Sequence, residues 1–187
     1  MQNQKKEKTR AFICIDFPDE VIKEVAKVQQ ILQKNTKFTG KIIEQENLHL
    51  TLKFLGEIDK LTLTKVKKEL EKIKFAPLTL MLSDVGTFNY KNNPRIVWIK
   101  INGEIFKLQK QIDELLSPIS PKEERFMSHL TIARIKYVKD REYFTSYIRN
   151  IKIKKLKFDI DNFKLKSSEL FPSGPVYKTI EAYSTKN

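Results

Sequence analysis

The sequence of 187 residues contains a single cysteine, only two histidines and no long uncharged hydrophobic run. Because Cys14 has no second cysteine to pair with, an internal disulfide is excluded, and a structural zinc site would need several other soft ligands. A reducing, cytoplasmic setting is therefore expected. The first ten residues are polar and rich in lysine, and no later window approaches eighteen uncharged apolar residues. The sequence thus predicts neither secretion nor a membrane span.

Acidic residues are also scarce relative to basic ones. Lys and Arg number 36 against 23 Asp and Glu, which gives a formal net charge of +13. A surplus of this size favours binding to a polyanion such as nucleic acid. The alternative is a lysine-rich surface that only keeps the protein soluble, since stretches such as 65–68 and 152–157 interleave lysines with apolar residues. Charge alone therefore points toward nucleic acid without proving it.

The predicted elements repeat once along the chain, in the order strand, helix, histidine-containing strand, helix. Ile13 precedes His49 by 36 positions, and Trp98 precedes His129 by a similar 31. The repeat predicts an α+β fold with a pseudo-two-fold axis: one bilobal domain over 9–184, with equivalent halves at about 9–90 and 91–184. Its antiparallel sheets are expected to face each other across a central groove, with helices on the outside.

Periodicity and breaker residues set the expected element boundaries. The predicted strands are Arg10–Phe17, Leu48–Gly56, Leu78–Ser83, Arg95–Ile101, Ser128–Arg134, Ile153–Glu169 and Val176–Tyr183. The predicted helices are Asp19–Gln33, Lys60–Ile73, Glu104–Leu116 and Asp140–Arg149. A loop is expected over Val85–Pro94, because four Gly and Asn residues fall within it.

Each histidine opens the same short motif. His49-Leu-Thr-Leu and His129-Leu-Thr-Ile alternate polar and aliphatic residues, which is typical of a strand with one buried face. His49 and Thr51 therefore point to one face of their strand, and His129 and Thr131 to one face of theirs. If the duplication brings the two strands together across the groove, these four side chains surround one small volume.

Two imidazoles and two hydroxyls suit in-line attack on a phosphodiester. With ordinary pKa values of about 6.5, one histidine can take a proton from water while the other gives one to the departing ribose oxygen. The threonines and a nearby cation can hold the phosphate oxygens. This set requires no metal or other cofactor, and a zinc pair is a weaker hypothesis because no third ligand is evident. A single strand histidine is usually a packing residue, but repetition of the whole context favours catalysis.

The sequence resembles the two-histidine (2H) phosphoesterase superfamily, and within it the RNA 2′,3′-cyclic phosphodiesterases, historically called 2′-5′ RNA ligases. The resemblance covers nearly the whole chain and rests on segments 10–13, 46–57, 95–98, 129–134 and 170–177. One departure is Ser128, since the family commonly has proline immediately before the second motif histidine.

The resemblance implies hydrolysis of an RNA terminal 2′,3′-cyclic phosphate to a 2′-phosphate. His49 would be the proton donor to the leaving 3′ oxygen and His129 the proton acceptor for water, with Thr51 and Thr131 as phosphate ligands. Arg134 matches a family arginine near the phosphate, although from the sequence alone it could equally be a charge at a strand end. The residues by themselves do not fix which histidine is the acid. The implied partner is RNA with a cyclic phosphate end, including tRNA fragments, and a monomer is expected, with no cofactor and no membrane.

Several aromatic residues are candidates for stacking on a terminal base. Phe88 and Tyr177 are interpreted as substrate-binding residues, and packing is the alternative for them as it is for Tyr90 and Phe126. Phe54 is expected to lie away from the site, because strand alternation places it on the face of Leu50.

Two other functions are compatible with the same residues. Joining of a cyclic phosphate end to a 5′-hydroxyl would use the same groups in reverse and would yield a longer RNA. A non-catalytic module would hold RNA ends without cleaving them, so its salt-sensitive binding would not depend on the histidines.

Overall fold

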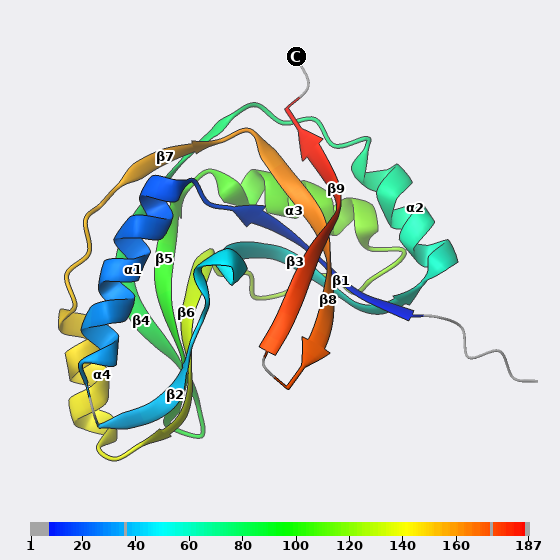
Figure 1. Cartoon of the computed structure of the whole chain (residues 1–187). Coiled ribbons are helices and arrows are strands. Elements are labelled where there is room, and N and C mark those ends of the chain that lie inside the picture. Colours follow the sequence, from blue (N-terminus) through cyan, green and yellow to red (C-terminus); the bar gives the residue numbers. More distant parts are fainter. Residues whose placement is uncertain (1–7, 36, 173, 186–187) are drawn as a thin grey trace, which may run out of the picture.

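The structure is a computed structural model that describes residues 8–35, 37–172 and 174–185. Four α-helices and nine strands form within these described ranges (Figure 1). In chain order they are β1 (Lys8–Asp16), α1 (Asp19–Gln33), β2 (Phe38–Ile42), β3 (His49–Asp59), α2 (Lys60–Leu70), β4 (Leu78–Tyr90), β5 (Asn93–Gly103), α3 (Ile105–Leu116), β6 (His129–Val138), α4 (Arg141–Asn150), β7 (Lys157–Ile160), β8 (Asn162–Phe171) and β9 (Gly174–Ser184).

All of these strands belong to one strongly curled antiparallel sheet with the order β7-β4-β5-β6-β3-β1-β8-β9, and β2 adds to β6. The helices lie on the outer side of the curl (Figure 1). The predicted α+β class, with antiparallel sheets and external helices, is confirmed. The two expected sheets are the two wings of a single sheet, joined where Leu50 of β3 pairs with Leu130 of β6.

The strand order reads symmetrically outward from the β3–β6 junction. One wing is β3-β1-β8-β9 and the other is β6-β5-β4-β7, so strand β4 of the first half of the sequence lies in the wing of β5. Similarly, α1 contacts β6 and α3 contacts β3. The parts of the chain before and after about residue 90 are therefore interleaved in space, and their equivalence as two halves stays a prediction.

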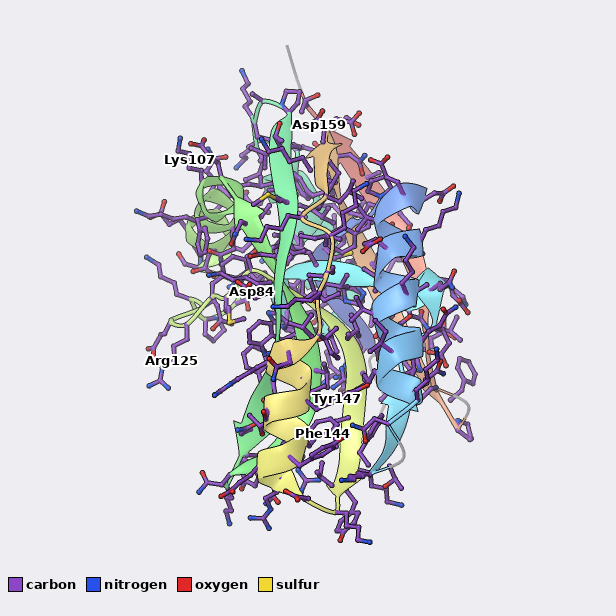
Figure 2. All side chains as sticks on the ribbon, turned by 90° about the vertical axis from the view of Figure 1, so that its left-hand side faces the viewer. Asp84, Lys107, Arg125, Phe144, Tyr147 and Asp159 are labelled. Carbon is purple, nitrogen blue, oxygen red and sulfur yellow. The ribbon has the colours of Figure 1, made fainter. Side chains whose placement is uncertain are left out.

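Helix α1 packs as its sequence predicts. Val21, Val25, Val28 and Leu32 recur at three- and four-residue spacing and are all buried, which places one stripe of the helix on the sheet. Figure 2 shows α1 beside α4, whose Tyr147 donates a hydrogen bond of 2.8 Å from its hydroxyl to the carbonyl oxygen of Ile31.

The prediction of a loop over Val85–Pro94 is wrong, because β4 and β5 form a hairpin there. Lys91 and Asn92 have φ values of 46° and 62° and make the two-residue turn, a conformation that matches the twist of paired strands. Gly86, read as a loop signal, is a strand residue: a Cβ at this position would collide with the ring of Trp98 on β5. Its lack of a side chain serves packing within the sheet.

Two further boundaries differ from expectation. The single strand predicted over Ile153–Glu169 is two strands, β7 and β8, which pair with β4 and β1 on opposite wings. Strand β2 was not predicted, because none of its residues is buried and the sequence carries no alternating pattern there. It adds to β6 through backbone pairing, and its end residues Phe38 and Ile42 pack against the core.

Candidate active site

Strand β3 holds an irregularity just after its histidine motif. On the neighbouring strand β1, Cys14 lies opposite Thr51 and Ile13 lies opposite Lys53, so Leu52 is an extra residue that forms a β-bulge. A bulge reverses the alternation of side chains beyond it. Lys53 consequently turns into the protein interior, and the following residue turns to the face of the histidine.

Strand β6 holds the same irregularity at the equivalent place. Trp98 of β5 lies opposite Thr131 and Val97 lies opposite Ala133, so Ile132 is the extra residue. Arg134 is thereby brought to the face of His129, although an odd spacing of five residues would put it on the opposite face of a regular strand.

Phe54 is the counterpart of Arg134 on β3, since each lies five residues after its motif histidine. The expectation that Phe54 faces away from His49 is wrong, because it assumed unbroken alternation through Leu52. Phe54 is 65% exposed and lines the same cavity as the histidine.

A cavity of about 640 Å³ opens between the wings, and its lining includes His49, Thr51, His129, Thr131 and Arg134. The antiparallel pairing of Leu50 with Leu130 explains the convergence, because the two histidines flank this pair and point to the same side of the sheet. Because β3 and β6 run antiparallel, His49 lies on the side of Thr131 and His129 on the side of Thr51. The four side chains predicted from the duplicated motif therefore do surround one volume.

Each imidazole is oriented by the backbone two residues before it. The Nδ1 atom of His49 is 2.8 Å from the carbonyl oxygen of Asn47, and that of His129 is 2.7 Å from the carbonyl oxygen of Met127. A carbonyl oxygen only accepts, so Nδ1 carries the hydrogen in both rings. The Nε2 atom of each ring is then left for chemistry at the cavity.

Both histidines favour the neutral form in the unliganded protein. Burial lowers the pKa of His49 to about 4, since its ring is packed between Phe12 and Tyr177, at centroid distances of 4.9 and 5.2 Å. Burial also lowers the pKa of His129, whose ring meets the edge of Phe88 at 4.9 Å. Neutral Nε2 atoms can accept protons, so at neutral pH a bound anion would be needed to keep one ring protonated.

The two predicted aromatic contacts lie in different positions. Tyr177 of β9 lines the cavity, and burial raises the pKa of its hydroxyl. Phe88 lies behind His129, against Trp98 at 5.5 Å, and is outside the lining. Neither Tyr90 nor Phe126 lines the cavity either.

The sequence interpretation missed Ile43 and Leu170, whose side chains contribute apolar wall to the cavity. It also gave no role to Phe12 and Asn47, whose ring and carbonyl position His49. The one signal available was their position inside segments 10–13 and 46–57, which carry the family resemblance.

No group of three or more His, Cys, Asp or Glu side chains in the described residues is placed to hold a metal ion. Cys14 is fully buried, and this burial raises the pKa of its thiol to about 12. None of the helices in the described part of the chain combines the length and the hydropathy that crossing a bilayer requires.

Comparison with known proteins identifies the family of the chain. The chain matches the model of LigT-like phosphoesterases over residues 15–98 and 100–177. It is 36% identical over 179 residues to the RNA 2′,3′-cyclic phosphodiesterase of Methanocaldococcus jannaschii, covering 93% of this chain and 99% of that protein. Over 177 residues it is 33% identical to the protein of the same name from Thermotoga maritima, covering 91% and 92% of the two chains.

Solved structures agree on the fold. The crystal structure of TT0787 of Thermus thermophilus matches with a TM-score of 0.81 at 26% identity, covering 94% of this chain and 97% of that one. E. coli LigT in its apo form matches with a TM-score of 0.76, covering 97% and 99% of the two chains; at 20% identity this likeness supports the architecture alone.

Proposed function

The chain belongs to the LigT-like phosphoesterase family, and from this premise we propose that it is an RNA 2′,3′-cyclic phosphodiesterase that leaves a 2′-phosphate without using a metal ion. The observation that carries the proposal is the single cavity lined by both histidine motifs and by Arg134. Two relatives that the chain covers almost end to end are named RNA 2′,3′-cyclic phosphodiesterase, which supports the class of reaction.

In the proposed reaction, the Nε2 atom of His129 accepts a proton from a water molecule as the water oxygen attacks the phosphorus. The bond between phosphorus and the 3′ oxygen breaks, and the Nε2–H of protonated His49 gives its proton to that oxygen. A 2′-phosphomonoester and a free 3′-hydroxyl result. Both Nδ1–H groups stay bonded to their carbonyl oxygens throughout, which holds both rings in position.

The bound phosphate explains how His49 becomes protonated. Its negative charge lies beside the ring and favours the imidazolium, so substrate binding raises the pKa of His49 from its low value in the empty cavity. Arg134 and the hydroxyls of Thr51 and Thr131 donate to the non-bridging oxygens, where charge builds up in the transition state.

The substrate in this proposal is an RNA end, such as that of a tRNA fragment, attracted by the net charge of +13. We propose that the protein acts as a monomer in a reducing cytoplasm, a setting inferred from its single cysteine.

The proposal is tested by incubating a short RNA that ends in a 2′,3′-cyclic phosphate with the protein, with and without a chelator, and identifying the product. A 2′-monophosphate formed at the same rate in both samples is expected. A 3′-monophosphate, no hydrolysis, or loss of activity with the chelator would each contradict it.

Adding a second RNA with a 5′-hydroxyl end extends the same experiment to joining. A longer RNA containing a 2′-5′ bond would identify the reverse reaction as an activity of this site. Salt-sensitive binding with no product at all would identify a module that only holds RNA ends.

A further inference from the structure

Three charged side chains form a cluster beside the proposed proton donor and outside the lining of the cavity. The carboxylate of Asp16 on β1 accepts a hydrogen bond of 2.6 Å from the Nζ atom of Lys166 and one of 2.9 Å from the Nζ atom of Lys164, both on β8. The side chain of Lys166 is 11% exposed. Two ammonium groups share one carboxylate, so the cluster has one positive charge in excess.

The register of the strands places this cluster next to the imidazole. Asp16 lies directly opposite His49 across β1 and β3. Side chains of directly opposite residues point to the same face of a sheet, with Cβ atoms about 5 Å apart. Lys164 lies opposite Cys14, which shares the face of Asp16 because it is two residues away, and Lys166 is two residues further along β8. All three charges therefore lie on the face of His49.

The position equivalent to Asp16 beside the second histidine carries the opposite charge. Lys100 of β5 lies directly opposite His129, and its side chain is exposed. The histidine that donates a proton in the proposed reaction thus has a carboxylate as its cross-strand neighbour, and the histidine that accepts a proton has an ammonium group. Because an anion stabilises an imidazolium and a cation destabilises it, this difference favours the donor role for His49.

We propose that Asp16, Lys164 and Lys166 are positioning residues that act through His49: Asp16 stabilises its imidazolium, and the two lysines offset this effect until the phosphate of the substrate is bound. This inference rests on the proposed function, because it takes His49 as the proton donor. The charge of the bound phosphate adds to that of Asp16 and makes the imidazolium favourable. The ring is then charged only in the complex that needs its proton.

The other titratable groups around the ring leave this role to the cluster. Arg134 of β6 lies across the cavity and, like Lys166, disfavours the imidazolium. Burial raises the pKa values of Tyr177 on β9 and Cys14 on β1, so both groups are neutral at pH 7. Asp16 is thus the anion that β1 supplies to His49 before substrate binds.

The test follows both histidines by NMR in the free protein while the charge of the cluster is changed. Lys166→Met removes one cation and is expected to raise the pKa of His49 from about 4 by about one pH unit or more, the size of effect that a nearby charge produces. Lys166→Arg keeps the charge and should leave this pKa unchanged. The pKa of His129, which lies opposite Lys100, should not move in either variant.

Asp16→Asn changes the charge of the cluster in the other direction, and its effect is measured through hydrolysis. The two lysines are then unopposed, so the alkaline limb of kcat against pH, which reports the proton donor in the complex, is expected to move to lower pH by about one unit. Lys166→Met should move the same limb to higher pH. A purely structural role of the cluster would lower activity in both variants without moving the limb in opposite directions.

Two further variants complete the set. Lys178→Met is the matched control, because it removes the same charge from an exposed pair with Glu169 on the hairpin of β8 and β9, and it should change neither measurement. If Lys166→Met does not fold, Lys164→Met takes its place, since the side chain of Lys164 is 28% exposed. It is also expected to raise the pKa of His49.

A pKa of His49 that does not rise when a lysine of the cluster is removed would overturn this proposal, and so would a kcat limb that moves the same way in Asp16→Asn and Lys166→Met. Hydrolysis by the unmodified protein would still uphold the proposed function in both cases. If the unmodified protein does not hydrolyse the cyclic phosphate RNA, the proposed function fails. The NMR titration then decides on the cluster: a rise for His49 alone supports it, and an unchanged titration overturns it.

Discussion

Strands β3 and β6 carry the same motif and the same bulge, but each bulge is held by different groups. On β6, the carbonyl oxygen of the extra residue Ile132 accepts hydrogen bonds from the side chain of Gln29 and the backbone N–H of Ile43, both at 3.0 Å. The corresponding glutamine for β3 is Gln109. It lies 20 residues before His129, just as Gln29 lies 20 residues before His49. It is buried, but its Nε2 atom has no hydrogen-bond partner in the described part of the chain.

An ion pair takes the place of that amide on β3. Beyond the bulge, the buried Nζ atom of Lys53 lies 2.5 Å from Asp113 of α3 and 2.7 Å from the carbonyl oxygen of Pro121. The carboxylate of Asp113 also accepts from the backbone N–H of Glu123. The equivalent residue on β6 is Ala133, which has no polar side chain. One wing is therefore held by a neutral amide and the other by a buried charge pair.

The surroundings of the two imidazoles differ as well. His49 lies between two aromatic rings, and burial lowers its pKa to about 4, whereas His129 meets one phenyl edge, and burial lowers its pKa as well. Two like groups in unlike environments are the usual basis for separate acid and base roles. Two strands with the same motif and the same bulge therefore place their histidines alike, while the side chains around the two rings differ.

The largest effect is expected from removing either imidazole. His49→Ala and His129→Ala should each lower kcat/KM on the cyclic phosphate RNA by about a hundredfold to ten-thousandfold, since in the proposed reaction each ring moves one proton in the transition state. Thermal unfolding of both variants, followed by circular dichroism, checks that they fold. Full activity in either variant would contradict a two-histidine mechanism.

Lys53→Met should destabilise the β3 wing specifically. The buried carboxylate of Asp113 loses its cation, so the free energy of unfolding in urea is expected to fall by about 3–5 kcal/mol. Replacing both partners with apolar residues, Lys53→Met with Asp113→Leu, should recover most of the loss.

The matched control for Lys53 is Lys107→Met, which breaks an exposed pair with Glu104 at the surface visible in Figure 2. It should change the free energy of unfolding by less than about 1 kcal/mol. A similarly small change for Lys53→Met would show that the buried pair does not hold this wing.

Arg134→Ala should affect activity and leave stability nearly unchanged. Loss of charge-assisted hydrogen bonds to the phosphate is expected to lower kcat/KM by roughly 10- to 150-fold. Arg134→Lys should retain part of the activity, because it keeps the charge without the forked donors of arginine. Steady-state kinetics with Arg125→Ala, an exposed arginine outside the cavity, provides the comparison. Equal kinetics for the two alanine variants would exclude Arg134 from the site.

A smaller effect is expected in the pH dependence. The proposed reaction needs one neutral and one protonated imidazole, and burial lowers both pKa values in the free protein. The bell-shaped profile of kcat/KM against pH should therefore give two apparent pKa values that both lie below 6.5. The profile of kcat should lie at higher pH, because the bound phosphate stabilises the imidazolium. A limb of kcat/KM above pH 7 would contradict the burial of the two rings.

Both histidines and both threonines could be placed from the sequence, because period-two alternation held between His49 and Thr51 and between His129 and Thr131. The bulges could not, since the bulged residue Ile132 accepts a hydrogen bond from Gln29, which lies more than a hundred positions away in the sequence. For this reason Arg134 was assigned through the family resemblance alone, and Phe54 was assigned to the wrong face. The β4–β5 hairpin was missed because Gly86 serves contact with Trp98 rather than a loop.

The central claim is that two imidazoles act on one phosphate, and the presence of only two histidines makes it directly measurable by NMR. Imidazole signals would be followed while adenosine 2′-monophosphate is added, at several pH values. Both rings are expected to respond with a single Kd, and both pKa values, about 4 for His49 and below 6.5 for His129 in the free protein, should rise on binding. A response from one ring only, or from neither, would contradict the account.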